Sequence, residues 1–585
     1  MIKILKYMKP REWAFALCSV LFIVAQVYLD LKLPDYMNDI TAKVSIEGGK
    51  LADVLIPGGM MLLCTLGSLV SSVIVAGFAA RIASNFSKEL RMLQYNQVES
   101  FSMKEINSFS TASLITRSTN DITQVQMIIA MGLQAFIKAP ITAVWAITKI
   151  AGKGMEWTAA TAGAVLMLIL MISVIVLFAV PKFKKIQWMT DNINRVTREN
   201  LTGLRVVRAY NAEKYQEEKF DKANTELTKT YLFASRIMSI IMPWMSLIMS
   251  GLSLSIYWIG TYLINAADLQ HKGALFSNMV VFMIYAIQVV MAFVMLSMVF
   301  IMLPRASVAA KRILDVIGTK PSILDGKIDS VPCEKKGEVV FKNVGFKYPD
   351  ASDYVLENIT FTAHKGETIA FIGSTGSGKS TLINLLPRFY DATEGEILID
   401  GINIKDYKLE TLHNKIGYVP QKAVMFSGSV RSNVAYGENG GDEYTEEDIK
   451  RAVEIAQSRD FVENMPEAYD GAVAQGGTNL SGGQKQRLSI ARAICRKPEI
   501  YIFDDTFSAL DYKTDKLLRS ALKGQTEKAT TFIVAQRIGT IRDADKIVVL
   551  DEGRIAGMGT HSELMKNCPV YQEIALSQLS KEELA

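Results

Sequence analysis

The chain has 585 residues, which is too many for one hydrophobic core, so several domains are expected. Hydrophobic residues make up 49% of the sequence and are concentrated in the first 304 positions. The net charge of +5 is small and the cations form no continuous basic tract, which argues against a nucleic-acid partner. The five cysteines have no CxxC spacing and fit a reduced compartment better than a disulfide framework.

Six segments of the apolar part are long enough to cross a bilayer, which takes about 20 residues. They run approximately over residues 13–33, 55–80, 127–147, 157–180, 237–267 and 274–304. The charged residues within them are Asp30, Lys32 and Lys138. Ionisable groups at membrane depth are functional candidates, but Asp30 could lie at the outer interface and Lys138 could pair or reach the headgroups. Neither residue is assigned as a ligand.

Long polar loops, Arg81–Asp121 and Pro181–Arg236, separate the second span from the third and the fourth from the fifth. The second loop has twelve Lys or Arg against seven Asp or Glu. Because positive charge near span ends marks the cytosolic side, both loops and both chain ends are expected in the cytosol. The sequence therefore predicts a multi-pass protein of the cell membrane. Apolar residues recur at helical spacing in Glu199–Phe220, which indicates either a solvated amphipathic helix or a helix that contacts another domain.

The character of the sequence changes after residue 304. Residues 305–335 are expected to form a charged helix and then a proline-containing linker. From residue 336 to residue 585, strand-like runs such as GEVVFKNVGF and ETIAFIG alternate with helical segments, which is typical of a soluble α/β domain. The predicted architecture is an all-α transmembrane domain with six spans, residues 1–304, fused to an α/β domain.

The most specific motif is GSTGSGKST, Gly373–Thr381, which matches the phosphate loop G-x-x-x-x-G-K-[ST]. It follows a predicted strand and opens a predicted helix, as this motif requires. Glycines let the backbone N–H groups wrap the phosphates of ATP, while Lys379 reaches the outer phosphates and the Ser380 hydroxyl ligates Mg²⁺. The candidate ATP-binding residues of the loop are Gly373, Ser374, Thr375, Gly376, Ser377, Gly378, Lys379, Ser380 and Thr381.

Further candidates lie outside the phosphate loop. Tyr348 ends a strand-like segment and could stack on the base, and Gln421 ends another strand and could contact Mg²⁺ and the attacking water. In LSGGQKQRLSIARAI, a glycine pair opens an amphipathic helix and forms a second anion site. In EIYIFDDTFSALD, a buried strand presents Asp504 to Mg²⁺, and Asp505 follows at the position expected to activate water.

These motifs, in this order, resemble the ATP-binding cassette (ABC) family. The resemblance covers nearly the whole chain, since six spans fused N-terminal to a cassette look like half of an ABC exporter. ASLITRSTNDITQ and GLRVVRAYNAE are similar to the exporters' inner loops, which carry short coupling helices. The resemblance implies an α/β P-loop cassette at residues 336–585, and cassettes of this family dimerise head to tail. The residues that would then hold the ATP of a partner's phosphate loop are Ser481, Gly482, Gly483 and Gln484.

Three positions depart from the family pattern. Asp505 replaces the Glu that acts as general base, and it is one CH₂ shorter, where a misplacement of about 1 Å can cost roughly 10²-fold in rate. Gln536 replaces the switch His and lacks the proton chemistry of imidazole. Gln475 stands where exporters usually have Glu, and the sequence indicates no functional consequence of this change. Since LSGGQ is intact, the chain resembles the degenerate-site subunit of heterodimeric bacterial ABC multidrug exporters, whose partner supplies the Glu and the His.

The predicted function is ATP-driven export of amphiphilic drugs or lipids, with hydrolysis mainly at the site that uses the partner's base. The alternatives are a self-sufficient homodimer with Asp505 as an adequate base, and an ATP-gated channel or regulatory module. Ten Met between residues 237 and 304 suit a cavity for varied apolar molecules, although packing and lipid contact are the commoner roles of Met.

Overall fold

The computed structural model describes residues 2–44, 51–151, 154–329, 336–441 and 443–578. The chain forms two compact units. The membrane unit comprises residues 1–99 and 112–319, and the cassette unit comprises residues 100–111 and 320–585. Residues 330–335 of the predicted linker and 579–585 of the predicted cassette lie outside the described residues.

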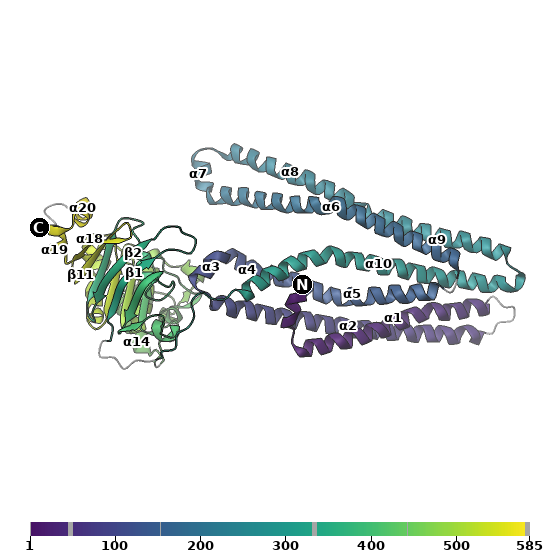
Figure 1. The fold of residues 1–585 in the computed structure, drawn as a ribbon, viewed down its shortest axis with the longest axis horizontal. Coiled ribbons are helices and arrows are strands. Elements are labelled where there is room, and N and C mark those ends of the chain that lie inside the picture. Colours follow the sequence, from purple (N-terminus) through teal and green to yellow (C-terminus); the bar gives the residue numbers. More distant parts are fainter. Residues whose placement is uncertain (1, 45–50, 152–153, 330–335, 442, 579–585) are drawn as a thin grey trace. The chain divides into compact units, whose positions relative to one another are not determined.

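The membrane unit consists of long helices (Figure 1). Among the described residues, six helices are long and apolar enough to cross a membrane, which confirms the prediction of six spans. The helices of this unit are η1 (Ile2–Tyr7), α1 (Pro10–Val44), α2 (Leu51–Glu99), α4 (Thr111–Thr116), η2 (Arg117–Asp121), α5 (Ile122–Ile150), α6 (Met155–Thr202), α7 (Leu204–Ala209), α8 (Glu213–Ser239), α9 (Ile241–Ala266) and α10 (Leu269–Gly318).

The helices extend well beyond the apolar spans because the adjoining polar segments are helical too. α2 continues from the second span to Glu99, and α6 continues from the fourth span to Thr202. α8 forms the last helical part of the second polar loop and leads into α9, and α10 continues through the predicted boundary at residue 304 to Gly318. Most of the two predicted polar loops is therefore an extension of the spans.

Two of the charged residues within the predicted spans, Asp30 and Lys138, pair with each other. Lys138 Nζ of α5 lies 3.2 Å from Asp30 Oδ2 of α1, and Ser68 Oγ of α2 donates to Asp30 Oδ1 at 2.5 Å. Further along α1, the Asp35 carboxylate accepts hydrogen bonds from Lys149 Nζ at 2.7 Å and from the Tyr285 hydroxyl at 2.8 Å. Charge away from water is costly unless it is paired. These contacts join α1 to α2, α5 and α10.

The cassette unit is built on two larger sheets. A six-stranded sheet has the order β12-β11-β3-β10-β9-β6, and a four-stranded antiparallel sheet has the order β2-β1-β4-β5. Side chains of both sheets meet in one hydrophobic core, which includes Phe341, Phe371 and Phe532. The strands are β1 (Val339–Phe346), β2 (Leu356–Ala363), β3 (Thr368–Gly373), β4 (Glu394–Ile399), β5 (Ile402–Asn403), β6 (Ile416–Val419), β7 (Gly428–Ser429), β8 (Ala472–Val473), β9 (Ile500–Asp504), β10 (Thr530–Val534), β11 (Lys546–Asp551) and β12 (Arg554–Gly559).

Parallel pairing in the larger sheet brings the chemically active segments to one edge. β9 and β10 are buried along their whole length, which explains their continuous apolar sequences. In the parallel register, Val534 is opposite both Asp504 and Phe371, and Val419 is opposite Phe503. β3, β6, β9 and β10 therefore end together, and the residues that follow them meet beyond their carboxyl ends.

The remaining cassette elements are helices that flank these sheets. The second hydrophobic core lies beneath them and includes Leu488, Phe503 and Ile533. The helices are α3 (Met103–Phe109), α11 (Lys379–Asn384), α12 (Leu409–Asn414), α13 (Val430–Val434), α14 (Glu446–Ile455), α15 (Arg459–Glu463), η3 (Ala468–Asp470), η4 (Gln475–Gly477), α16 (Gly482–Cys495), α17 (Tyr512–Thr526), α18 (Ile538–Ile541), α19 (His561–Asn567) and α20 (Pro569–Gln578).

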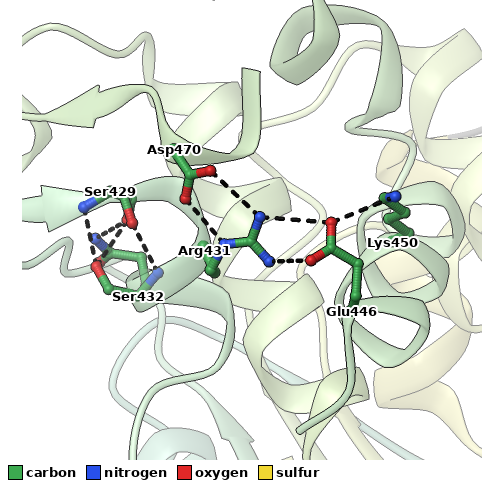
Figure 2. Close-up of polar contacts among 7 residues, drawn as sticks. Ser429, Arg431, Ser432, Glu446, Lys450 and Asp470 are labelled. Carbon is green, nitrogen blue, oxygen red and sulfur yellow. Dashed lines mark hydrogen bonds and ion pairs between the residues drawn. The ribbon is translucent and has the colours of Figure 1, made fainter. Parts of the chain in front are cut away.

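An arginine holds three of these elements together (Figure 2). Arg431 of α13 donates to both carboxylate oxygens of Asp470 in η3 and of Glu446 in α14. Lys450 adds a second cation at 3.3 Å from Glu446. The carboxylates are largely exposed, so the cluster orients the surface around α16 more than it stabilises the core.

Candidate active site

The phosphate loop connects β3 to α11, as its motif requires. Gly378 caps α11 with φ of +93°, a backbone conformation that L side chains rarely adopt. At Gly373, an added Cβ would lie 2.1 Å from the Leu550 carbonyl oxygen, so only glycine lets the loop leave β3 beside β11. These two positions explain why the loop between the strand and the helix is rich in glycine.

Lys379 and Ser380 occupy the inner side of the loop. Lys379 Nζ donates to the Gly373 and Ser374 carbonyl oxygens at 2.9 and 2.7 Å. Burial lowers the pKa of Lys379, while the carboxylates of Asp504 and Asp505 act in the opposite direction. A cation directed at this loop matches the charge of nucleotide phosphates.

Ser380 and Asp504 bring two oxygen atoms of the kind that bind hard cations next to each other. Ser380 Oγ donates to Asp504 Oδ1 at 2.8 Å. Burial raises the pKa of Asp504, and the neighbouring Asp505 adds to that rise. A divalent cation would offset the cost of this charge, and oxygen ligands of these types suit Mg²⁺. Ser380 and Asp504 thus fit Mg²⁺ and would hold it, and the ion would supply positive charge beside nucleotide phosphates. Among the described residues, no cluster of three or more His, Cys, Asp or Glu forms a separate metal site.

The Asp505 carboxylate is held by two amide side chains. Gln536 Nε2 donates to Asp505 Oδ2 at 2.7 Å, and Gln421 Nε2 donates to the same oxygen at 3.2 Å. Asp505 has φ of +45°, and its backbone is fixed by hydrogen bonds with Val534 and Ser508. A non-glycine residue in this region costs about 1–3 kcal/mol and persists where its surroundings over-determine it. The carboxylate is therefore held by residues that follow β6 and β10, the two strands that flank β9.

Tyr348 lies beside the phosphate loop, and its hydroxyl is 3.0 Å from Thr381 Oγ1. Its ring meets that of Tyr390 edge-on, with centroids 5.4 Å apart. The Tyr390 hydroxyl accepts a hydrogen bond from Asn107 Nδ2 of α3 at 3.1 Å. Ser102 and Glu105 form a capping box that fixes the start of α3. A chain of contacts thus runs from α3 to the candidate base-stacking residue.

The LSGGQ segment forms the start of α16. Ser481 is the N-cap: its hydroxyl accepts from Gln484 N, and Ser481 N donates to Gln484 Oε1 at 2.8 Å. Gly482 is exposed, and an added Cβ there would meet nothing within 4 Å. The four candidate residues for a partner's ATP thus form one ordered helix start with an open approach.

The structure places the candidates in two groups. Residues of the phosphate loop, Tyr348, Gln421, Asp504, Asp505 and Gln536 gather around the ends of β3, β6, β9 and β10, whereas Ser481–Gln484 form the start of α16. The exposed Gln475 lies in η4. Tyr390 and Asn107 could not be found from the sequence, because a lone tyrosine and a lone asparagine in polar segments carry no motif. The contact of both amides with one oxygen was also not expected.

The fold and the site together define a membrane transporter whose cassette hydrolyses ATP. The family model described as ABC transporter transmembrane region matches residues 13–293, and the model described as ABC transporter matches residues 356–508. The chain is 36% identical over 581 residues to an uncharacterized ABC transporter ATP-binding protein of Mycobacterium tuberculosis (strain CDC 1551 / Oshkosh), covering 98% of this chain and 97% of that protein. The chain belongs to the ABC transporter family, as its motifs predicted.

Two further similarities define the type of transporter. The chain is 30% identical over 581 residues to a multidrug resistance ABC transporter ATP-binding and permease protein of Lactococcus lactis subsp. lactis (strain IL1403), covering 99% of this chain and 95% of that protein. The structure of a bacterial Atm1-family ABC exporter with ATP bound has the same fold, with a TM-score of 0.78 at 24% identity over 96% of this chain and 97% of that one. The chain is thus an ABC exporter with fused transmembrane and cassette domains, a class of multi-pass membrane proteins that act as dimers.

Proposed function

We propose that this chain is one half of a heterodimeric exporter of amphiphilic drugs or lipids. In this proposal its own phosphate site binds ATP with Mg²⁺ and turns it over slowly, while its LSGGQ segment completes the partner's active site. The observation that carries the proposal is the Asp505 carboxylate, which is short and bound through one oxygen by Gln421 and Gln536.

A general base has to reach water and take its proton. Asp505 Oδ2 already accepts two hydrogen bonds, and Asp505 lacks the CH₂ that would extend the carboxylate. The second contact comes from Gln536, an amide that donates a hydrogen bond but does not exchange a proton as imidazole does. Both changes leave phosphate binding intact, because the loop binds phosphate through its backbone and Lys379.

The other half of the proposal concerns the partner chain. Ser481, Gly482 and Gly483 keep the family sequence, and their helix start is capped and open. A partner with the consensus Glu and His would place its own ATP against this segment. Turnover in the pair would then depend on this chain's LSGGQ and on the partner's base.

The class of substrate follows from the membrane unit and from its relatives. The multidrug resistance protein of Lactococcus lactis is similar over nearly its whole length, which favours amphiphilic small molecules as substrates. Methionines of α9 and α10 such as Met245, Met279 and Met283 are buried or half-buried, and flexible thioethers adapt to varied apolar molecules. Positive charge near the ends of the spans favours a cytosolic location for both termini, beside the ATP supply.

The experiment measures the ATPase rate of this chain alone, of the Asp505→Glu/Gln536→His double variant, and of the chain co-expressed with a candidate partner. We expect the chain alone to be nearly inert, the partner to restore turnover and the double variant to gain activity. Full activity of the chain alone, unchanged by the double substitution, would instead establish the self-sufficient homodimer, in which Asp505 is an adequate base.

A further inference from the structure

Two arginines share one aromatic ring near the start of α1. Arg11 Cζ lies 5.7 Å and Arg81 Cζ lies 5.4 Å from the centroid of the Phe15 ring. The ring stacks on Phe78 with a centroid distance of 5.4 Å and an interplanar angle of 26°. Arg11 and Phe15 belong to α1, whereas Phe78 and Arg81 belong to α2. The paired helices therefore hold two guanidinium groups around one fixed ring.

These cations have little internal counter-charge. Neither arginine forms an ion pair within the described ranges, and Lys9 already binds the nearby Glu89 carboxylate at 2.5 Å. The other acidic residue of this end of α1 is Glu12, whose side chain is buried with only 6% exposure. Two positive charges held around one ring repel each other, and an anion placed between them would relieve that repulsion.

Arg11 and Arg81 lie at the ends of the apolar segments of α1 and α2. The exposed Trp13 and Leu17 follow Arg11 on α1, and the uncharged segment of α2 ends at Ala80, directly before Arg81. In a membrane, the phosphate groups of lipids lie at such an edge. Guanidinium groups at this depth face lipid headgroups and not the hydrocarbon.

η1 adds further positive charge directly before α1, at the end of the chain marked N in Figure 1. Its Ile4 is fully buried in a cluster with Ile82 and Phe86 of α2, which fixes this short helix against the second span. Lys3 and Lys6 of η1 are thereby held beside the start of α1. The region combines four cations from three helices.

We propose that Arg11 and Arg81 bind the phosphate group of an anionic phospholipid. A guanidinium binds phosphate oxygens through two parallel hydrogen bonds, and the cation–π contact with Phe15 restricts the position of each guanidinium beforehand. A zwitterionic lipid brings its own ammonium group, which Lys3 and Lys6 would repel, so the site selects an anionic headgroup. The bound lipid would join α1 to α2 at the end where the chain enters the membrane. This site is independent of the ATP chemistry and of the choice of partner.

The test uses the purified full-length chain in detergent, freed of lipid. Its thermal unfolding midpoint is followed against increasing concentrations of phosphatidylglycerol, phosphatidylcholine or inorganic phosphate, which yields an apparent Kd for each. We expect phosphatidylglycerol to raise the midpoint well above the effect of phosphatidylcholine. The Arg11→Gln/Arg81→Gln variant should weaken the apparent Kd for phosphatidylglycerol by at least about 10-fold, because it removes two charge-assisted contacts.

A matched control removes the same total charge from α2 alone, farther from the edge. The Lys88→Gln/Arg91→Gln variant should bind phosphatidylglycerol as the unchanged chain does. If the arginine variant unfolds, Arg11→Lys/Arg81→Lys keeps the charge and should bind with intermediate affinity. Equal affinity of all variants would overturn the proposal, and so would an equal response to inorganic phosphate, which would show a free-phosphate site without lipid selectivity.

Discussion

Two parts of the cassette are candidate ATP sites, and they differ in how far they depart from the family pattern. The site at the ends of β3, β9 and β10 keeps its phosphate loop but has Asp505 and Gln536 in place of Glu and His. The start of α16 keeps every residue of LSGGQ and a complete capping box. Phosphate binding rests on backbone geometry, whereas hydrolysis rests on a single carboxylate and its reach. One function can therefore be lost from a fold that retains the other.

The largest effect is expected from Gly482→Ala. A Cβ at this position meets nothing within 4 Å in this chain, so folding should be unchanged. In the proposed heterodimer the methyl group would displace the partner's ATP, and a shift of about 1 Å can lower the rate by roughly 10²-fold. The ATPase rate of the heterodimer measures this. Gly524→Ala, equally free of contacts, is the control and should leave the rate unchanged.

A smaller effect is expected from Tyr390→Phe, which keeps the ring contact with Tyr348 and removes the hydrogen bond from Asn107. Losing one neutral hydrogen bond should lower the stimulation of ATPase rate by transported substrate about 3- to 10-fold. The basal rate should stay the same. Asn107→Ala should reduce the stimulation by the same factor. The double variant should reduce it no further, because each single change removes the same hydrogen bond. Multiplied effects in the double variant would contradict this path between α3 and the base-stacking residue.

Asp505→Asn tests whether this chain's own phosphate site contributes to hydrolysis. If hydrolysis occurs mainly at the partner's base, this change should alter heterodimer turnover by less than about 3-fold, well below the factor of about 10–10³ that loss of a working catalytic group costs. The corresponding Glu→Gln change in the partner should abolish turnover. A large loss from Asp505→Asn alone would show that both sites hydrolyse ATP and would remove the contrast with LSGGQ.

Asp504→Asn should stabilise the nucleotide-free chain. Burial raises the pKa of Asp504, so the native state holds this proton more tightly than the unfolded state, and ionisation costs stability at neutral pH. The melting temperature at pH 7.5 should rise by about 2–4 °C for each kcal/mol regained. The gain should shrink as the pH is lowered and the unchanged Asp504 takes up its proton. Asp511→Asn is the control without a gain, because hydrogen bonds from Thr514 lower the pKa of that exposed carboxyl.

From the sequence, candidate residues of the ATP site can be named one by one, whereas the membrane unit can be predicted only span by span. A motif such as GSTGSGKST predicts the phosphate loop itself. It also predicts which other segments lie beside that loop, because parallel strands end at one edge of the sheet. The contact of Gln536 with Asp505 depends on side-chain reach across that edge, which no motif encodes. In the spans, apolar length predicts crossing but leaves the register between helices open. The pairing of Asp30 with Lys138 therefore appeared only in the structure.

The smallest effect is expected from Arg431→Gln, in the exposed cluster beside the LSGGQ helix. Hydrogen bonds from Arg431 lower the pKa of Glu446 and of Asp470, so their stabilising effect is present above the ordinary carboxyl pKa near 4 and is lost as the pH falls through the lower native value. Because exposed ion pairs contribute little, the melting temperature at pH 7 should fall by no more than about 2 °C, and less in high salt. A fall beyond about 5 °C that persists at pH 3 and in high salt would mean that Arg431 acts through packing. The LSGGQ side would then depend on a buried support, not on surface charge.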